Sequence, residues 1–332
     1  MSYSIRVFAL ITALVLGGTF VPAQPPAHAG TPPPCEYDSA TNRVSIETDE
    51  ATEIRRNGRD IFYKFLFESE SEFRSCDGAT VDNTDLIEFT DTSDFGQIPI
   101  LIDASRGPFA PGATPENRGK PEIEFHLRQE ADQVSARAQM LYLEGSDDAD
   151  FIVGGMRGMK LNRDKDIDIA FRTGEGSLNI DAERGDDQVY LDGRKGTGPF
   201  DPTSDYAHSI EGNRGEDRFV GSSLNDSLDG GASRDSLKGG AGIDEIYGDS
   251  GSDRILGQGG NDSLGGSFGN DHVIAGAGAD KLRGDDGDDH LEGSSGNDRI
   301  RGHKGNDHLD GDAGIDVCHP GPGKDTKEDC ER

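Results

Sequence analysis

Thirteen aspartates recur at strict nine-residue intervals in the C-terminal third of the 332-residue chain. They are Asp217, Asp226, Asp235, Asp244, Asp253, Asp262, Asp271, Asp280, Asp289, Asp298, Asp307, Asp316 and Asp325. A carboxylate serves as an acid, a base or a ligand for a hard cation, and an even row of thirteen singles out no catalytic acid. The spacing therefore favours repeated metal binding over catalysis.

These aspartates occupy position six of thirteen consecutive nonapeptides that run from Gly212 to Glu328 without insertion. Glycine fills position one in eleven units and position four in eleven; the exceptions are Ala275 and Pro320 at position one and Leu224 and Ser233 at position four. Glycine accepts positive φ, so the first half of each unit predicts a tight turn. The alternating second half predicts a short strand.

Two units complete one coil of eighteen residues, and each strand then lies on its equivalent, about 4.8 Å away, in parallel pairing. The apolar residues at position eight form a thin core between the two resulting sheets. They are Phe219, Leu228, Leu237, Ile246, Ile255, Leu264, Val273, Leu282, Leu291, Ile300, Leu309 and Cys318. One apolar side chain per nine residues is too little to hold such a fold together alone.

Stacking also places Asp217 beside Asp235 and Asp226 beside Asp244. Ionised carboxylates a few ångströms apart repel one another, so the metal-free coil is unstable near neutral pH. Calcium accepts six to eight oxygen ligands, which carboxylates of adjacent coils and turn carbonyls can supply, whereas magnesium demands a tighter octahedron. The sequence therefore predicts multiple bound Ca²⁺ ions.

The units resemble the RTX, or haemolysin-type, calcium-binding nonapeptide GGxGxDxUx over residues 212–328. The resemblance implies a parallel β-roll that folds when calcium is supplied, with the thirteen position-six aspartates and backbone carbonyls as ligands. Leu224 and Ser233 depart from the pattern in the turns before Asp226 and Asp235.

Upstream, residues 121–211 are interpreted as degenerate solenoid coils, with a separate small domain as the alternative. Asp150, Asp168 and Asp187 follow one another at about twice the nonapeptide spacing and are candidate further ligands. The segment from Gly193 to Asp205 reads as an insertion.

Residues 30–120 have a pattern typical of β-strands. A dense apolar run lies at 61–67, and apolar and polar residues alternate at 98–102 and, just beyond this region, at 123–127. A β-rich cap is expected there, with a ligand-binding module as the alternative. The predicted fold class is all-β: a parallel β-roll or β-helix solenoid preceded by an irregular β-helical or β-rich N-terminal region, and ended by a tail at 329–332.

Residues 1–29 have the form of a secretory signal peptide. Val7–Val21 is an apolar run of fifteen residues that precedes Ala27-His28-Ala29, and it is shorter than the roughly twenty residues of a membrane span. A secreted, extracellular protein is expected. Its four cysteines then predict disulfides, and sequence proximity favours Cys35–Cys76 and Cys318–Cys330 among three connectivities.

The chain carries 64 acidic and 33 basic residues, a net charge of −31. This charge disfavours nucleic acid as a partner, and no second long apolar stretch favours membrane insertion. Calcium ions are the partners that the residues predict; a cell-surface or matrix partner cannot be read from them.

The predicted function is a non-catalytic, secreted, calcium-binding β-roll with a structural, adhesive or ion-binding role. The alternative is an extracellular enzyme or lytic toxin with activity in residues 31–211 and the roll as a folding and secretion aid. Gly265–Gly269 imitates a hydrolase G-x-S-x-G motif, but it falls inside the nonapeptide register and lacks the strand, turn and helix that the chemistry requires.

Three histidines, His272, His290 and His308, occupy position seven at intervals of eighteen residues. The coil period predicts that they form an outward-facing column, and stacked imidazoles are ligands for a transition metal. The alternative is that they are ordinary exposed strand residues.

Overall fold

A computed structural model describes residues 35–41, 43–48, 52–57, 60–65, 73–80, 86–91, 99–103, 124–129, 139–144, 151–155, 158–160, 169–171, 176–192 and 207–331. All of them belong to the unit Pro34–Arg332. The predicted signal peptide lies outside the described residues, as do Asp150 and Asp168. No helix long and apolar enough to cross a membrane occurs in the part of the chain that the structure describes.

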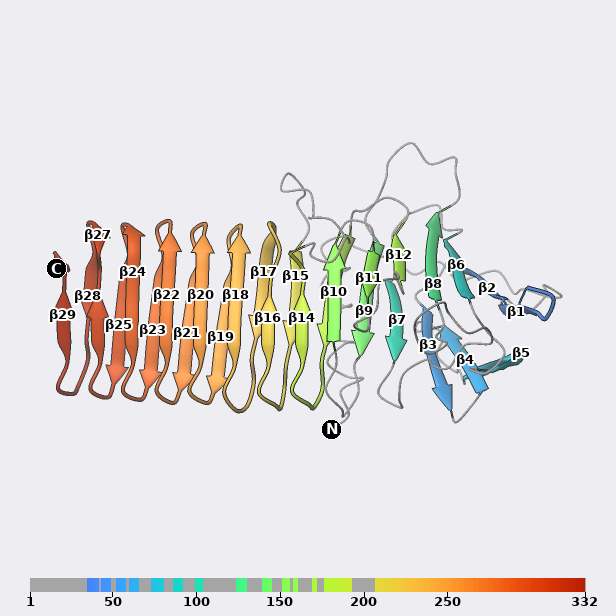
Figure 1. The fold of residues 1–332 in the computed structure, drawn as a ribbon, viewed down its shortest axis with the longest axis horizontal. Coiled ribbons are helices and arrows are strands. Elements are labelled where there is room, and N and C mark those ends of the chain that lie inside the picture. The colour runs from blue at the N-terminus through green and yellow to red at the C-terminus, as the bar shows by residue number, and fades with distance from the viewer. Residues whose placement is uncertain are drawn as a thin grey trace, which may run out of the picture. The chain divides into compact units, whose positions relative to one another are not determined.

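The described strands form two sheets of 16 and 13 strands, here called sheet A and sheet B (Figure 1). Sheet A contains β1 (Cys35–Asp38), β2 (Arg43–Thr48), β6 (Leu86–Asp91), β8 (Glu124–Gln129), β12 (Ile169–Phe171), β11 (Gly158–Lys160), β10 (Phe151–Gly155), β14 (Gln188–Tyr190), β16 (Arg218–Val220), β18 (Ser236–Ala241), β20 (Arg254–Gly259), β22 (His272–Ala277), β24 (His290–Gly296), β26 (His308–Asp310), β27 (Ala313–Gly314) and β29 (Thr326–Glu328). Sheet B contains β5 (Arg74–Thr80), β4 (Asp60–Phe65), β3 (Thr52–Asn57), β7 (Pro99–Asp103), β9 (Gln139–Glu144), β13 (Gly176–Asp181), β15 (Ala207–Glu211), β17 (Asn225–Asp229), β19 (Glu245–Ser250), β21 (Ser263–Phe268), β23 (Lys281–Asp286), β25 (Arg299–Lys304) and β28 (Val317–His319). The predicted all-β fold class is confirmed, and no described residue is helical.

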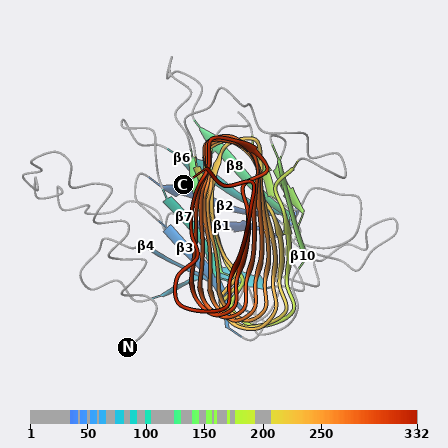
Figure 2. The ribbon, with the colours of Figure 1, turned by 90° about the vertical axis from the view of Figure 1, so that its left-hand side faces the viewer.

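From β15 onward the chain alternates between the sheets, and each strand pairs in parallel with the strand eighteen residues later. Phe219 lies opposite Leu237 in sheet A, and Leu228 lies opposite Ile246 in sheet B. Figure 2 looks along this stack, in which successive coils superpose and the two long sides are the two sheets. The predicted coil of two nonapeptides is therefore confirmed.

The core between the sheets is the predicted column of position-eight side chains. All twelve, from Phe219 to Cys318, are buried, because alternation along each short strand turns this position inward. Lys327 takes the place of an apolar residue in the last unit and is exposed. The apolar column therefore ends where the coils end.

Parallel pairing continues upstream of the regular units. In sheet B it runs from β15 through β13, β9 and β7 to β3, and in sheet A it joins β2, β6 and β8. Antiparallel pairs interrupt it at β1–β2, β3–β4–β5 and β10–β11–β12. The strands predicted near residues 61–67, 98–102 and 123–127 correspond to β4, β7 and β8.

The four cysteines form the two predicted disulfides, Cys35–Cys76 and Cys318–Cys330. The first joins β1 to β5, and the second fastens the chain after β29 to β28. Both bonds lie near an end of the described fold, where a strand lacks a neighbour on one side. The domain boundaries proposed from the sequence stay predictions.

Candidate metal centre

Each position-six aspartate lies directly before, or as the second residue of, a short strand, with its side chain turned between the sheets. The exposed fraction of the twelve residues from Asp217 to Asp316 is 0–3 %. Asp325, in the last unit, is half-buried. The sequence-predicted carboxylates are thus brought into two inward columns, one along each sheet.

A ladder of hydrogen bonds joins each aspartate to the next one in its column. In the eleven units from Asp217 to Asp307, the backbone N–H of the aspartate donates to Oδ1 of the aspartate eighteen residues later, at N–O distances of 2.7–3.0 Å. The predicted neighbours Asp217 and Asp235, and Asp226 and Asp244, are joined in this way. The ladder uses one oxygen of each carboxylate.

The other oxygen, Oδ2, is buried and accepts no hydrogen bond from any described residue in ten of the ladder aspartates. They are Asp235, Asp244, Asp253, Asp262, Asp271, Asp280, Asp289, Asp298, Asp307 and Asp316, and Oδ2 of Asp217 is in the same state. A buried carboxylate oxygen without a partner is costly. These eleven atoms supply carboxylate oxygens of the kind that a hard cation binds.

Position one is glycine because the carboxylate lies against it. An ideal Cβ built on Gly257 would lie 2.6 Å from Asp262 Oδ2 and 2.6 Å from the carbonyl oxygen of Ala275 in the next coil. At Gly302 the same point is 2.3 Å from Asp307 Oδ2 and 2.4 Å from the carbonyl oxygen of Pro320. Carboxylate and carbonyl oxygens of adjacent coils therefore converge on one cradle that a side chain would fill.

Position four is glycine because the coils approach most closely there. At Gly260, with φ of +140°, an added Cβ would lie 1.4 Å from the carbonyl oxygen of Gly242 in the preceding coil. Such a contact is impossible for any other residue. The turn carbonyls are thereby stacked at the separation of the coils.

Burial raises the pKa of most ladder carboxyls, and neighbouring carboxylates add to the effect. Burial raises the pKa of Asp217 and of Asp244 to about 8, although each also accepts a backbone hydrogen bond that opposes the shift. The pKa of Asp289 is raised to about 7 for the same reasons. The protein alone therefore stabilises these carboxyls in the protonated form.

The second unit differs from its neighbours, in the turn where the sequence departs from the pattern. Leu224 is buried, and the N–H and hydroxyl of Ser222 donate to Asp226 Oδ2 at 2.6 and 3.0 Å. Ser222 also lacks the positive φ that its counterparts adopt, such as Asp249 at 65°. Asp226 is thus satisfied by its own turn.

Ser233, at position four of the third unit, adopts the positive φ of the glycines that it replaces, which strains its backbone. Ser233 has φ of 104°, a conformation that a residue with a Cβ rarely adopts. The Oδ2 atom of Asp235, which follows this turn, stays buried without a hydrogen-bond donor among the described residues. Replacing glycine by Ser233 therefore leaves the carboxylate of Asp235 available to a cation, whereas replacing it by Leu224 changes the surroundings of Asp226.

Two members of the columns were recognised poorly or missed from the sequence. Asp187, named only as a candidate further ligand, extends one column: its N–H donates to Asp217 Oδ1 at 2.8 Å across thirty residues of sequence. His208, which was missed, lies opposite Asp226, and its Nδ1 accepts the N–H of Leu178 at 3.1 Å. Its position eighteen residues before Asp226 was the available signal.

A second ladder, also missed, runs through position five. Oδ1 of Asn261 accepts the N–H of Ala279 at 2.8 Å, and Asn297 does the same for Ile315 at 3.0 Å. Each of these asparagines accepts a hydrogen bond from the coil that follows it, whereas each ladder aspartate accepts one from the coil that precedes it. Asparagine at position five therefore satisfies the turn backbone and leaves the aspartate as the cation ligand.

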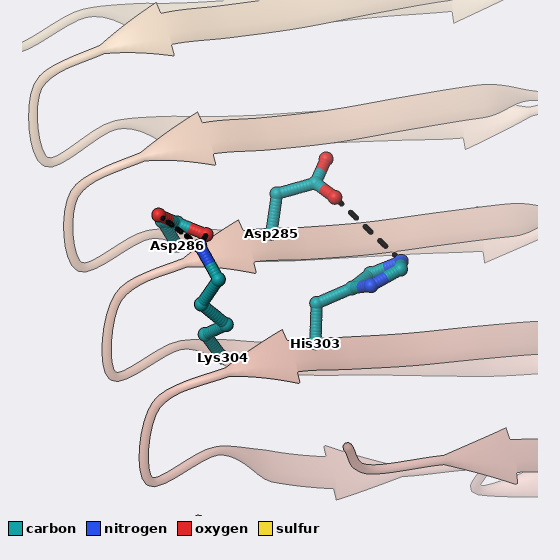
Figure 3. A network of polar contacts seen from close by, with 4 residues as sticks. All are labelled: Asp285, Asp286, His303 and Lys304. Atoms are coloured by element: carbon teal, nitrogen blue, oxygen red, sulfur yellow. Dashed lines mark hydrogen bonds and ion pairs between the residues drawn. The ribbon is translucent and has the colours of Figure 1, made fainter. Parts of the chain in front are cut away.

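Four outward side chains of β23 and β25 pair with each other and not with the aspartate columns. Lys304 Nζ lies 2.8 Å from Asp286 Oδ1, and His303 Nε2 lies 3.6 Å from Asp285 Oδ1; Figure 3 shows both pairs. All four side chains are 42–72 % exposed. They are solvated pairs of little energetic weight.

Calcium fits the aspartate columns, with backbone oxygens as necessary co-ligands. Within the described residues, no three ladder carboxylates gather closely enough to bind one ion by side chains alone. The convergent carbonyl oxygens beside the glycines supply the missing oxygen donors that calcium accepts. From Asp217 to Asp325 the ligand positions of the described columns offer carboxylate oxygens alone, which favours a hard cation.

Comparison with known proteins agrees with this geometry. No curated protein and no solved structure gives a match to the chain. A family model that describes four copies of the RTX calcium-binding nonapeptide repeat matches residues 211–246, 229–264, 265–298, 283–318 and 292–326. Residues 211–326 of this chain are therefore RTX calcium-binding nonapeptide repeats folded as a parallel β-solenoid.

Proposed function

We propose that the chain is an exported, non-catalytic protein whose RTX solenoid becomes a rigid structural element when it binds calcium outside the cell. The observation that carries the proposal is the row of buried Oδ2 atoms without hydrogen-bond donors among the described residues. Such a row is unfavourable in the protein alone, so the fold requires a cation for stability.

The ligands in this proposal are the position-six aspartates together with the carbonyl oxygens beside position one. Bound calcium supplies positive charge that offsets the carboxylate repulsion. Position-eight side chains exclude water, the Oδ1 ladder orients each carboxylate, and the glycines keep the oxygen cradle open. Asp226 contributes least, because Ser222 already donates to its Oδ2.

The dependence on calcium suits a secreted protein with the predicted leader at residues 1–29. Where calcium is scarce, as in a cytosol, the repelling columns keep the solenoid unfolded and competent for export. Where calcium is abundant, the same columns fold and the surface becomes available for a structural or adhesive role.

A calcium titration of the full chain by calorimetry, with circular dichroism in parallel, tests the proposal. Asp271→Asn keeps the Oδ1 acceptor for Asp253 but replaces the unpartnered oxygen by an amide, so we expect at least one calcium ion fewer per chain. Asp226→Asn is the matched control and should leave the stoichiometry unchanged. Equal losses in both variants, or no calcium binding by the parent chain, would contradict the proposal.

A further inference from the structure

A column of histidines lies on the outer face of sheet A, outside the aspartate columns. His272, His290 and His308 come from the adjacent strands β22, β24 and β26 and are direct register partners. The ring centroids are 4.9 Å apart for the first pair and 4.7 Å apart for the second. The predicted outward column is therefore present.

A column of acids begins beside the histidines in the same coils. Glu292 lies two residues after His290 on the same face of β24, and it is the register partner of Asp310, which in turn pairs with Glu328. One strand earlier, the equivalent position is Ile274. Imidazoles and carboxylates thus appear together over the last coils of this face.

These side chains form the two groups of three metal-ligating residues that occur within the described residues. The ligand atoms of His272, His290 and Glu292 all lie within 4.8 Å of one another, and so do those of His308, Asp310 and Glu328. The first group is half-buried throughout, whereas Glu328 in the second is exposed. The first group is therefore the better formed.

We propose that His272, His290 and Glu292 bind one divalent transition-metal ion of the zinc class, separately from the calcium columns. Two imidazoles and one carboxylate, with a fourth position open to water, are a common zinc donor set. Calcium prefers oxygen ligands only, so the two kinds of site select different ions. The inward aspartates and outward histidines alternate along the strands, which keeps the sites on opposite faces of the sheet.

In each group one histidine nitrogen already has a partner, so the exposure of Glu328 decides the expected order of affinities. Arg254 Nη1 donates to His272 Nδ1 at 3.1 Å, so this guanidinium competes with a metal ion for the first group. In the second group His308 Nδ1 is already 2.7 Å from Thr326 Oγ1, and Glu328 is solvated. His308, Asp310 and Glu328 therefore form a second, weaker site.

Calorimetric titration of the calcium-saturated full chain with ZnCl₂ tests the proposal. We expect one tight and one weaker zinc site per chain. His290→Gln and, separately, Glu292→Gln should weaken the tight site by more than about tenfold, the loss that even an outer-shell partner commonly causes. Arg254→Ser removes the competing cation and should tighten it.

His319→Gln is the matched control, because His319 is exposed on β28 of sheet B, where its register partner is Arg301. This variant should bind zinc as the parent does. Circular dichroism of every variant in calcium shows that the fold is intact, and Co²⁺ loading should give the intense visible absorption of a four-coordinate site that His290→Gln abolishes. Zinc isotherms that are identical for His290→Gln and His319→Gln would overturn the proposal.

Discussion

The coils upstream of residue 182 and the RTX coils share parallel pairing but fill their interiors differently. In β13 both inward residues, Leu178 and Ile180, are apolar and buried. Two coils later in the same sheet, the equivalent residues are Asp226 and Leu228. The comparison shows that the same backbone arrangement has two kinds of interior. Apolar side chains alone fill the upstream coil, whereas the RTX coils combine apolar side chains with carboxylates that require cations.

His208 lies at the junction between the two regions. It stands between Leu178 and Asp226 in the sheet B column, and its Nδ1 accepts the backbone N–H that an aspartate Oδ1 accepts in later coils. Burial lowers its pKa to about 4, so it is neutral at pH 7. His208 therefore accepts the hydrogen bond that an aspartate accepts elsewhere in the ladder, but it carries no negative charge.

Removing calcium should separate the two regions most strongly. With a chelator at pH 7.5, we expect amides of residues 212–328 to lose protection against hydrogen–deuterium exchange, because the uncompensated carboxylates repel. Amides of β2 and β3, whose inward residues include Val44, Ile46 and Ile54, should stay protected. Mass spectrometry of peptides from the full chain measures both, and equal loss in both regions would contradict the comparison.

Acid should partly replace calcium in the RTX region alone. The folded pKa values of Asp217 and Asp244, about 8, exceed the ordinary value of 3.8, so the folded state binds more protons than the unfolded state. The stability of the metal-free solenoid is therefore greatest below about pH 4 and is lost as the pH rises toward 8.

The measurement is the exchange protection of residues 212–328 in chelator at pH 5 and pH 8, after correction for intrinsic exchange rates. Protection should be greater at pH 5. With saturating calcium the sign reverses, because the ion requires ionised carboxylates. A metal-free solenoid that is more protected at pH 8 would refute the account of the buried columns.

Filling the space between the carboxylate and carbonyl oxygens beside one position-one glycine should lower stability by an intermediate amount. Gly266→Ala places a Cβ 2.3 Å from Asp271 Oδ2, so we expect a loss of about 1–3 kcal/mol in urea unfolding with calcium present. Gly259→Ala is the control, because the nearest atom to its Cβ is 4.0 Å away, and it should change stability by less than about 0.5 kcal/mol. Equal effects would show that backbone entropy, not the cradle, explains the glycine.

Effects on stability no larger than that of Gly266→Ala are expected at the junction. His208→Leu leaves the buried N–H of Leu178 without its acceptor and should cost about 1–3 kcal/mol at pH 7. His208→Asn keeps an acceptor and should cost less. Because the depressed pKa of His208 opposes folding as the pH falls from 6.5 toward 4, the Asn variant should also be less sensitive to acid. Thermal unfolding across this pH range measures both changes.

The sequence predicted the parts of the fold that repeat. The spacing of Asp217 and Asp235 and the apolar residue at position eight were enough to predict the coil length, the inward columns and the core. The disulfides followed from proximity and from the expected export. Each of these features depends on local periodicity, which a single sequence displays directly.

The remaining features depend on contacts that have no fixed spacing. Thirty residues separate Asp187 from Asp217, so the period did not reveal that they are neighbours. His208 was missed because it lies eighteen residues before Asp226, as the period requires, but is a histidine and not an aspartate. The parallel strands β2, β3, β6 and β7 were expected only as part of an irregular β-helical or β-rich region, since two apolar inward residues per strand resemble those of any buried sheet.

The coil of two nonapeptides also constrains how the length of the array can change in evolution or engineering. Loss or gain of one nonapeptide keeps every aspartate and apolar residue in its inward column, but it transfers all later residues to the opposite sheet. A contact between outer residues of successive coils, such as that of Arg254 with His272, depends on a separation of eighteen residues, so one nonapeptide inserted between the two residues places them on opposite sheets. The inward columns therefore lengthen in steps of nine residues, whereas an outer column on one sheet, such as His272, His290 and His308, lengthens only in steps of eighteen.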